Sequence, residues 1–135
     1  IRHDDPRWDT TFAKLVDELL SLASGADRQR AVIWVGPYAF RGWASRDIGV
    51  RVNAILKART AAFAGPAFYV DAYEPTLDRD TRKPITEFVP RGTTEILPAR
   101  GKDGVHLKTA VVRELLAEPT LGAIAECFGW QEREN

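Results

Sequence analysis

The feature that most constrains this fold is an unbroken apolar run at residues 31–35, Ala-Val-Ile-Trp-Val, which the pair Gly36-Pro37 cuts off. β-Branched and aromatic residues of this kind favour a strand, and the run has no polar position. A strand without a polar face is typical of a parallel sheet that helices cover on both faces. The run therefore predicts an α/β fold.

Helical patterns flank this strand. Asp5-Pro6 has the form of an N-cap followed by proline at the first helical position, and apolar residues then recur at helical spacing to about Ser24, where Gly25 ends the pattern. A second helix is predicted from a cap at Ser45 to the pair at 65–66, Gly-Pro. A second strand follows at residues 67–70 and ends in aspartate.

The remainder divides into a long excursion and helical segments. Residues 73–102 contain prolines, glycines and mixed charge, which indicates a long surface loop with only short strand-like pieces, such as 86–89. Its basic side chains, Arg100 among them, are expected to be solvated, with binding of an anionic substrate as the alternative. A helix is predicted from about residue 107 to 118, burying Val111, Val112, Leu115 and Leu116. Pro119 is expected to break it before one more helix.

This alternation of helices and strands implies a parallel sheet within a single domain of 135 residues. Two strands are too few for a complete sheet of this kind, because a strand as apolar as residues 32–35 needs a neighbouring strand on each of its edges. Either the chain oligomerises through its sheet, or a further segment of the same fold is absent from residues 1–135.

Composition excludes several classes of protein. Nineteen basic residues balance nineteen acidic ones, so the chain has no bulk field to attract nucleic acid. No apolar run is long enough to span a membrane, and a single cysteine allows no intrachain disulfide. A flavodoxin-like or nucleotide-binding domain is disfavoured, because no glycine-rich phosphate loop follows a strand. We expect no cofactor and no metal.

A candidate catalytic pair lies near the end of the excursion. Asp103 precedes His106 by three residues, in a turn that leads into a helical pattern. A carboxylate at this spacing can bond to the imidazole Nδ1 and fix its tautomer, which leaves Nε2 free to take a proton from a nucleophile. The same letters also fit an ordinary turn at Asp103-Gly104 that carries a half-exposed histidine.

The order of these features resembles the C-terminal part of the SGNH hydrolase family, the GDSL-type esterases. The family's last block is Asp-x-x-His followed by a helix, and Asp103-Gly-Val-His106 matches it. The run Val32 to Pro37 looks like a late core strand with its loop, and Phe68 to Asp71 looks like a strand carrying an aspartate towards the active-site edge. The start, Ile-Arg-His-Asp-Asp, is similar to the residues directly after the family's Gly-x-Asn-Asp block.

The resemblance implies a three-layer α/β/α fold of which this chain is the C-terminal portion. The family's Gly-Asp-Ser nucleophile and its glycine and asparagine oxyanion donors have no counterpart here, so we expect an N-terminal segment of the same polypeptide, as a separate chain, to supply them. The implied activity is a serine esterase that removes O-acyl groups, such as acetyl, from a carbohydrate or small ester. An exported or periplasmic location is implied as well. The alternative is a catalytically inactive relative that serves binding or structure.

Three further groups of residues have two interpretations each. Tyr38, Phe40 and Trp43 follow the first strand, where they either line a substrate pocket or pack under the long loop. Asp71 either supports the active site or caps a turn. His3, together with Asp4 and Asp5, either forms a metal site or belongs to the solvated start of a helix.

Overall fold

The centre of the molecule is a two-stranded parallel sheet. The computed structural model describes residues 2–40 and 46–129. Strand β1 (Val32–Val35) pairs with β2 (Ala67–Val70), so that Val32 lies opposite Ala67 and Val35 opposite Val70. Both predicted strands and their parallel pairing are confirmed.

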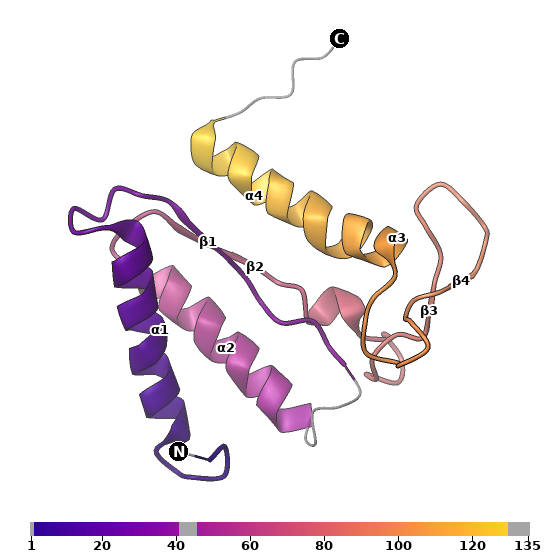
Figure 1. Cartoon of the computed structure of the whole chain (residues 1–135), viewed down its shortest axis with the longest axis horizontal. Helices are drawn as coiled ribbons and strands as arrows, with labels where there is room; N and C mark the ends of the chain where they lie inside the picture. The colour runs from indigo at the N-terminus through magenta and orange to yellow at the C-terminus, as the bar shows by residue number, and fades with distance from the viewer. Residues whose placement is uncertain (1, 41–45, 130–135) are drawn as a thin grey trace.

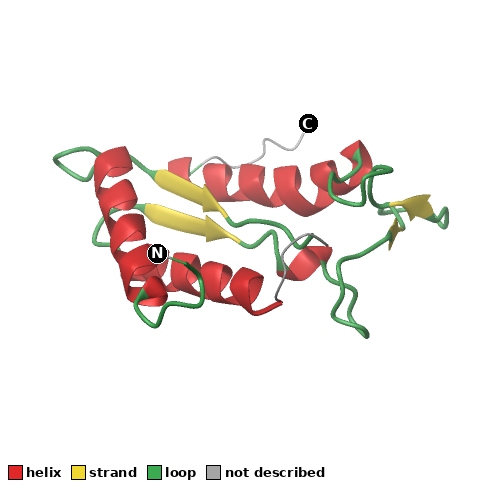
Figure 2. Cartoon of the chain, turned by 60° about the horizontal axis from the view of Figure 1, so that its bottom comes forward, coloured by secondary structure: helices red, strands yellow, loops and turns green. Residues whose placement is uncertain are grey.

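Helices lie on both faces of this sheet (Figures 1 and 2). Helices α1 (Trp8–Ser24) and α2 (Arg46–Ala62) pack side by side on one face, and α4 (Glu118–Phe128) crosses the other. The main core lies between α1, α2 and the sheet, and is formed by buried Val16, Leu20, Val52 and Leu56. The fold is therefore mixed α/β, as the alternating pattern predicts.

Helix α1 begins two residues later than predicted. The Asp5 carboxylate does not cap a helix that starts at Pro6; it accepts hydrogen bonds from the Arg7 backbone N–H at 2.8 Å and from Arg7 Nη2 at 2.9 Å. This local ion pair holds residues 5–7 in a turn that precedes the helix. The predicted end is confirmed, since Gly25 follows Ser24 with φ +82°, a value that favours glycine.

The predicted break at Pro119 is wrong. Helix α3 (Thr109–Val112) continues through a π-helical turn (Arg113–Ala117) directly into α4. Proline lacks an N–H and clashes with the carbonyl four residues earlier in a regular helix, whereas a π turn shifts the hydrogen bonds by one residue and makes room for it. The helix also starts later than residue 107, because Lys108 N donates to Ala99 O at 2.9 Å. Val112, predicted to be buried, is exposed.

The excursion lies beyond the carboxyl ends of both strands. It contains a short 3-10 helix (Glu74–Thr76) and an antiparallel pair, β3 (Glu87–Phe88) with β4 (Leu97–Pro98). Figure 1 shows this region at the end of the sheet where β1 and β2 finish and α3 begins. The polar excursion is therefore placed where open parallel sheets hold their ligands.

Strand β1 has an open edge. Among the described residues no strand pairs with the side of β1 that faces away from β2, and the Val35 residue is 39% exposed. A central strand buried on both edges would not leave an apolar residue so accessible. The described part of the chain therefore has two parallel strands in this sheet and leaves one edge of β1 unpaired.

Candidate active site

Asp103 and His106 lie in a tight turn that connects β4 to α3. The turn closes on itself, since Gly101 N donates to His106 O at 2.7 Å and Gly104 N donates to Gly101 O at 3.0 Å. Gly104 has φ +68°, a left-handed conformation that glycine adopts without strain. The interpretation as a turn is confirmed, and the same turn brings the two candidate side chains together.

The Asp103 carboxylate bonds to the imidazole with one oxygen and to the backbone of the turn with the other. Oδ2 is hydrogen-bonded to His106 Nδ1, and Oδ1 accepts the backbone N–H groups of Val105 at 2.9 Å and His106 at 3.1 Å. The hydrogen bond from His106, followed by those from the two backbone N–H groups, lowers the pKa of Asp103 from its ordinary value of 3.8 to about 2. The carboxylate is therefore ionised at neutral pH and fixes Nδ1 as the bonded nitrogen.

The other ring nitrogen faces outward. The His106 side chain is 81% exposed, and its Nδ1 is the nitrogen engaged by Asp103. Nε2 is then the basic nitrogen that an approaching hydroxyl group could use. An exposed imidazole held in this way is chemically able to act as a general base.

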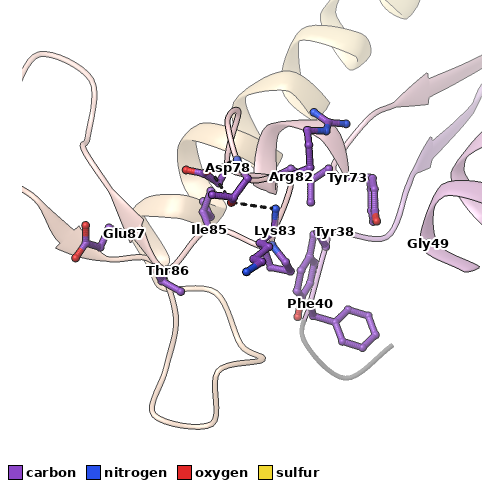
Figure 3. A pocket seen from close by; sticks show the side chains of 14 residues that line it. Tyr38, Phe40, Gly49, Tyr73, Asp78, Arg82, Lys83, Ile85, Thr86 and Glu87 are labelled. Atoms are coloured by element: carbon purple, nitrogen blue, oxygen red, sulfur yellow. Dashed lines mark hydrogen bonds between the residues drawn. The ribbon is translucent and has the colours of Figure 1, made fainter. Parts of the chain in front are cut away.

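A pocket of about 570 Å³ lies at the carboxyl ends of β1 and β2. Tyr38 and Phe40 line it, with ring centroids 6.1 Å apart in an edge-to-face arrangement, and Tyr73 contributes a third ring. Figure 3 shows Tyr38 and Phe40 on one side and Ile85, Thr86 and Glu87 on the other, with Lys83 between. Trp43, the third predicted substrate residue, lies outside the described residues.

Asp103 and His106 do not line this pocket. Their turn is connected to it through Arg100, which is 6% exposed although the sequence places it in a solvated basic loop. Its guanidinium donates to the carbonyl oxygens of Ala39, Ile85 and Val105. Because two of these acceptors, Ala39 and Ile85, are 61 and 15 residues away, no spacing in the sequence identifies Arg100, and the prediction that it is solvated is wrong.

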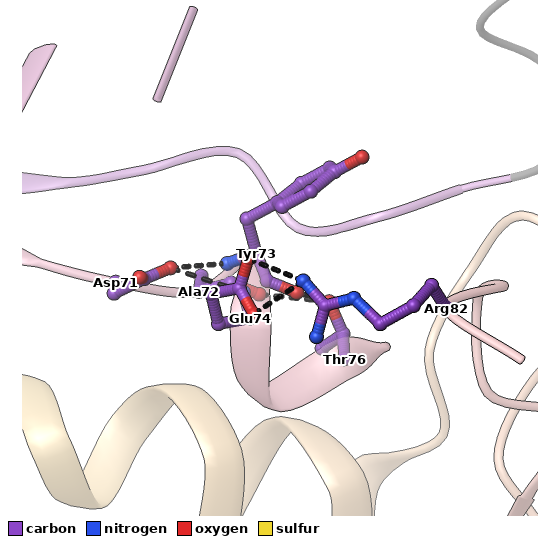
Figure 4. A network of polar contacts seen from close by, with 6 residues as sticks. All are labelled: Asp71, Ala72, Tyr73, Glu74, Thr76 and Arg82. Carbon is purple, nitrogen blue, oxygen red and sulfur yellow. Dashed lines mark hydrogen bonds and ion pairs between the residues drawn. The ribbon is translucent and has the colours of Figure 1, made fainter. Parts of the chain in front are cut away.

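Asp71 has a capping role. Its Oδ1 accepts the backbone N–H groups of Tyr73 at 2.8 Å and Glu74 at 3.1 Å, which starts the 3-10 helix (Figure 4). Glu74 in turn pairs with Arg82 at 2.7 Å, which ties the excursion back to the end of β2. Of the two interpretations of Asp71, the structure favours the cap, and the capped turn presents Tyr73 to the pocket.

A buried polar network supports the loop after β1. Asn53 Nδ2 donates to Gly49 O at 2.8 Å, and Asn53 Oδ1 accepts a hydrogen bond from the Tyr69 hydroxyl. Burial, with a smaller contribution from the negative charge of Asp71, raises the pKa of Tyr69 to about 12. A Cβ at Gly36 would lie 2.4 Å from Asn53 Oδ1, so only glycine fits where β1 turns towards the pocket.

A metal centre has no support in the described ranges. No group of three His, Cys, Asp or Glu side chains in residues 2–40 and 46–129 could hold a metal ion. His3 is exposed, and its backbone carbonyl accepts from Arg51 Nη1 at 3.1 Å. In the same ranges, no helix combines the length and apolar character needed to cross a membrane.

Comparison with known proteins gives a family without a stated activity. No curated protein matches the chain. Residues 1–120 match the family described as "protein of unknown function (DUF459)", which covers the sheet, the pocket and the Asp103–His106 turn. The chain therefore belongs to the DUF459 family.

Proposed function

We propose that this chain supplies the Asp–His half of a serine ester hydrolase of SGNH type, with Asp103 and His106 as catalytic residues. The observation that carries the proposal is the Asp103–His106 hydrogen bond, which orients an exposed imidazole. The parallel pair β1–β2 between α1–α2 and α4 supports a three-layer fold of which this chain is the C-terminal portion.

The mechanism is acyl transfer to water. A serine hydroxyl attacks the ester carbonyl while His106 Nε2 takes its proton, and the ionised Asp103 stabilises the resulting imidazolium. The tetrahedral intermediate expels the alcohol, which receives the proton from His106. Water then attacks the acyl-serine with His106 again as the base, and the carboxylic acid and free serine are released.

The nucleophile belongs to a segment that adds parallel strands at the open edge of β1. That edge presents unpaired backbone groups, and parallel sheets in α/β proteins have strands on both sides of their most apolar strand. The carboxyl ends of added parallel strands would lie at the same edge of the sheet as the excursion, so a serine that follows such a strand would be at the end of the molecule that carries His106.

An apolar stripe on α1 lies on the same side of the molecule as the open edge of β1. Helix α1 faces α2 through Asp17, which pairs with Arg59 at 2.6 Å. Leu15, Leu19 and Leu22 follow at i, i+4 and i+7 on the side of α1 turned away from α2, and they are 47%, 43% and 76% exposed. Since α1 packs on β1 and α2 on β2, this leucine stripe flanks the open edge and would be covered by the added segment.

The substrate class follows from the resemblance and from the pocket. An O-acylated carbohydrate fits a hollow with aromatic rings and a few polar groups, and acetyl is the simplest acyl group. A catalytically inactive relative that uses the same crevice for binding is the second candidate. It would have the Asp103–His106 turn but no serine in the partner segment.

The test uses the assembled protein and its two histidines. Hydrolysis of p-nitrophenyl acetate is expected to fall by at least about 10³-fold in His106→Ala. His3→Ala is the matched control, because His3 is exposed and outside the turn, and it should keep full activity. Mass spectrometry under denaturing conditions should find a second polypeptide with Gly-Asp-Ser. Equal activity of the two variants would refute the proposal.

A further inference from the structure

The peptide of Ala39 is held from both sides. Its N–H donates to Thr76 Oγ1 at 2.9 Å, and its carbonyl accepts from Arg100 Nη2 at 2.5 Å. Ala39 is 2% exposed, so these bonds are shielded from water. The flanking rings of Tyr38 and Phe40 therefore line the pocket from a fixed backbone.

The opposite wall of the pocket is fastened to the same guanidinium. Arg100 Nε donates to Ile85 O at 2.8 Å, and Ile85 lines the pocket across from Tyr38. The third bond, from Arg100 Nη1 to Val105 O at 3.1 Å, reaches the turn that holds His106. One planar group thus joins both walls of the pocket to the turn that carries His106.

Backbone hydrogen bonds also join the pocket wall to the segment of His106. Ala99 N donates to Thr86 O at 2.8 Å, and Lys108 N donates to Ala99 O at 2.9 Å. The pocket wall at Ile85 and Thr86 and the turn of His106 are therefore neighbours in the fold, although His106 does not line the pocket. An ester whose alcohol is a sugar can place the sugar ring in the pocket and its acyl group at the turn.

We propose that this pocket is the subsite for the carbohydrate alcohol of the ester, and that Arg100 is the positioning residue that sets its distance from His106. The inference rests on the proposed function and names a part of the substrate site. Tyr38 and Phe40, which are only partly buried, offer flat faces for the C–H side of a sugar ring. Lys83 and Glu87, neither of which forms an ion pair with a described residue, offer hydrogen bonds to its hydroxyl groups.

The experiment compares two esters with Phe40→Ala and a matched control, Phe128→Ala. Phe128 is 73% exposed at the end of α4 and does not line the pocket. With an O-acetylated xylo-oligosaccharide, Phe40→Ala should raise KM about tenfold. With p-nitrophenyl acetate, whose single ring has no hydroxyl groups for Lys83 and Glu87 to bind, Phe40→Ala should raise KM less than with the oligosaccharide, and Phe128→Ala should keep kcat/KM within about twofold for both esters. Equal effects of Phe40→Ala on both esters, or no effect on either, would overturn the subsite.

Arg100→Lys tests the positioning role, since lysine keeps the charge but cannot bond to three carbonyls in one plane. It should lower kcat for the oligosaccharide more than for p-nitrophenyl acetate. An equal loss on both esters would reduce Arg100 to a structural role and contradict the proposal.

A binding measurement separates this inference from the proposed function. Saturation-transfer NMR with the same oligosaccharide should show binding to His106→Ala and lost binding in Phe40→Ala. If no ester is hydrolysed but this pattern is seen, the subsite stands and the hydrolase proposal fails. If esters are hydrolysed but Phe40→Ala binds normally, the subsite fails and the hydrolase proposal stands.

Discussion

Arg100 donates a hydrogen bond to the carbonyl oxygen of Ala39, 61 residues earlier in the chain, and so joins the loop after β1 to the segment that carries the candidate catalytic turn. The bond is buried, and the same guanidinium also serves Ile85 and Val105. Four segments that have no local reason to meet are held at the carboxyl end of the sheet by this residue and by Thr76. The stability of the fold should therefore depend on the Arg100 guanidinium.

Arg100→Met should lower the free energy of unfolding by about 2–5 kcal/mol, because three buried carbonyl groups lose their donor. Arg79→Met is the matched control, since Arg79 is an exposed residue of the same excursion, and it should change stability by less than about 0.5 kcal/mol. Urea denaturation monitored by circular dichroism measures both. Equal stability of the two variants would show that the Arg100 bonds contribute nothing.

The ionisation of Asp103 should report its bond to His106. In a carbon-detected NMR titration the Asp103 carboxyl should titrate with a pKa of about 2, and His106→Ala should raise that pKa part of the way towards 3.8, because the two backbone N–H donors remain. Asp78, whose pKa is lowered by bonds to Thr81, is the internal control and should not move.

The sign of the associated pH dependence is fixed by the direction of this pKa shift. A carboxyl whose pKa is lower in the folded state stabilises the fold fully above its ordinary pKa. That contribution should fall away as the pH drops from about 4 to about 2. Thermal denaturation across this window should therefore show a smaller acid dependence in Asp103→Asn than in the wild type.

Two glycines provide a matched test of packing at the loop after β1. Gly36→Ala would place a Cβ 2.4 Å from Asn53 Oδ1 and 2.5 Å from the Tyr69 hydroxyl oxygen, which should destabilise the fold by about 1–3 kcal/mol. Gly122→Ala, within α4, meets no atom within 4 Å and should stabilise the fold by about 0.5–1 kcal/mol through helix propensity. Differential scanning calorimetry should give shifts of opposite sign.

The leucine stripe on α1 should govern assembly without affecting the fold of this chain. Leu22→Glu replaces a residue that is 76% exposed, so its melting temperature should stay near the wild-type value while association with the segment that carries the serine weakens. Lys14→Glu, on a polar side of the same helix, should leave association unchanged. Analytical ultracentrifugation measures which complex Leu22→Glu disrupts. Loss of a complex with a different polypeptide supports the proposed partner. Loss of a homodimer would contradict it and show that the stripe binds a second copy of this chain.

Sequence patterns are sufficient to predict the helices, strands and turns whose residues are close together in the chain. The apolar run at 32–35, the strand at 67–70 and the helix that ends at Gly25 are each determined by propensity, periodicity and a backbone stop. The Asp103–His106 contact is also predictable, because it spans three residues within one turn. The continuation of the helix through Pro119 is not, since proline ordinarily breaks a regular helix and the apolar pattern does not distinguish an α turn from the π turn that precedes it.

Sequence alone thus determined the α/β class, the parallel pair of strands and the bonded Asp103–His106 pair. Tertiary structure alone decided that Arg100 is buried, that Tyr38 and Phe40 share a pocket with Tyr73, and that this pocket lies beside the turn rather than around it. The physical reason is range: hydrogen bonds within a turn are encoded by neighbouring residues, whereas the bonds of Arg100 join positions 39, 85 and 105, which meet only when the sheet and the excursion have packed.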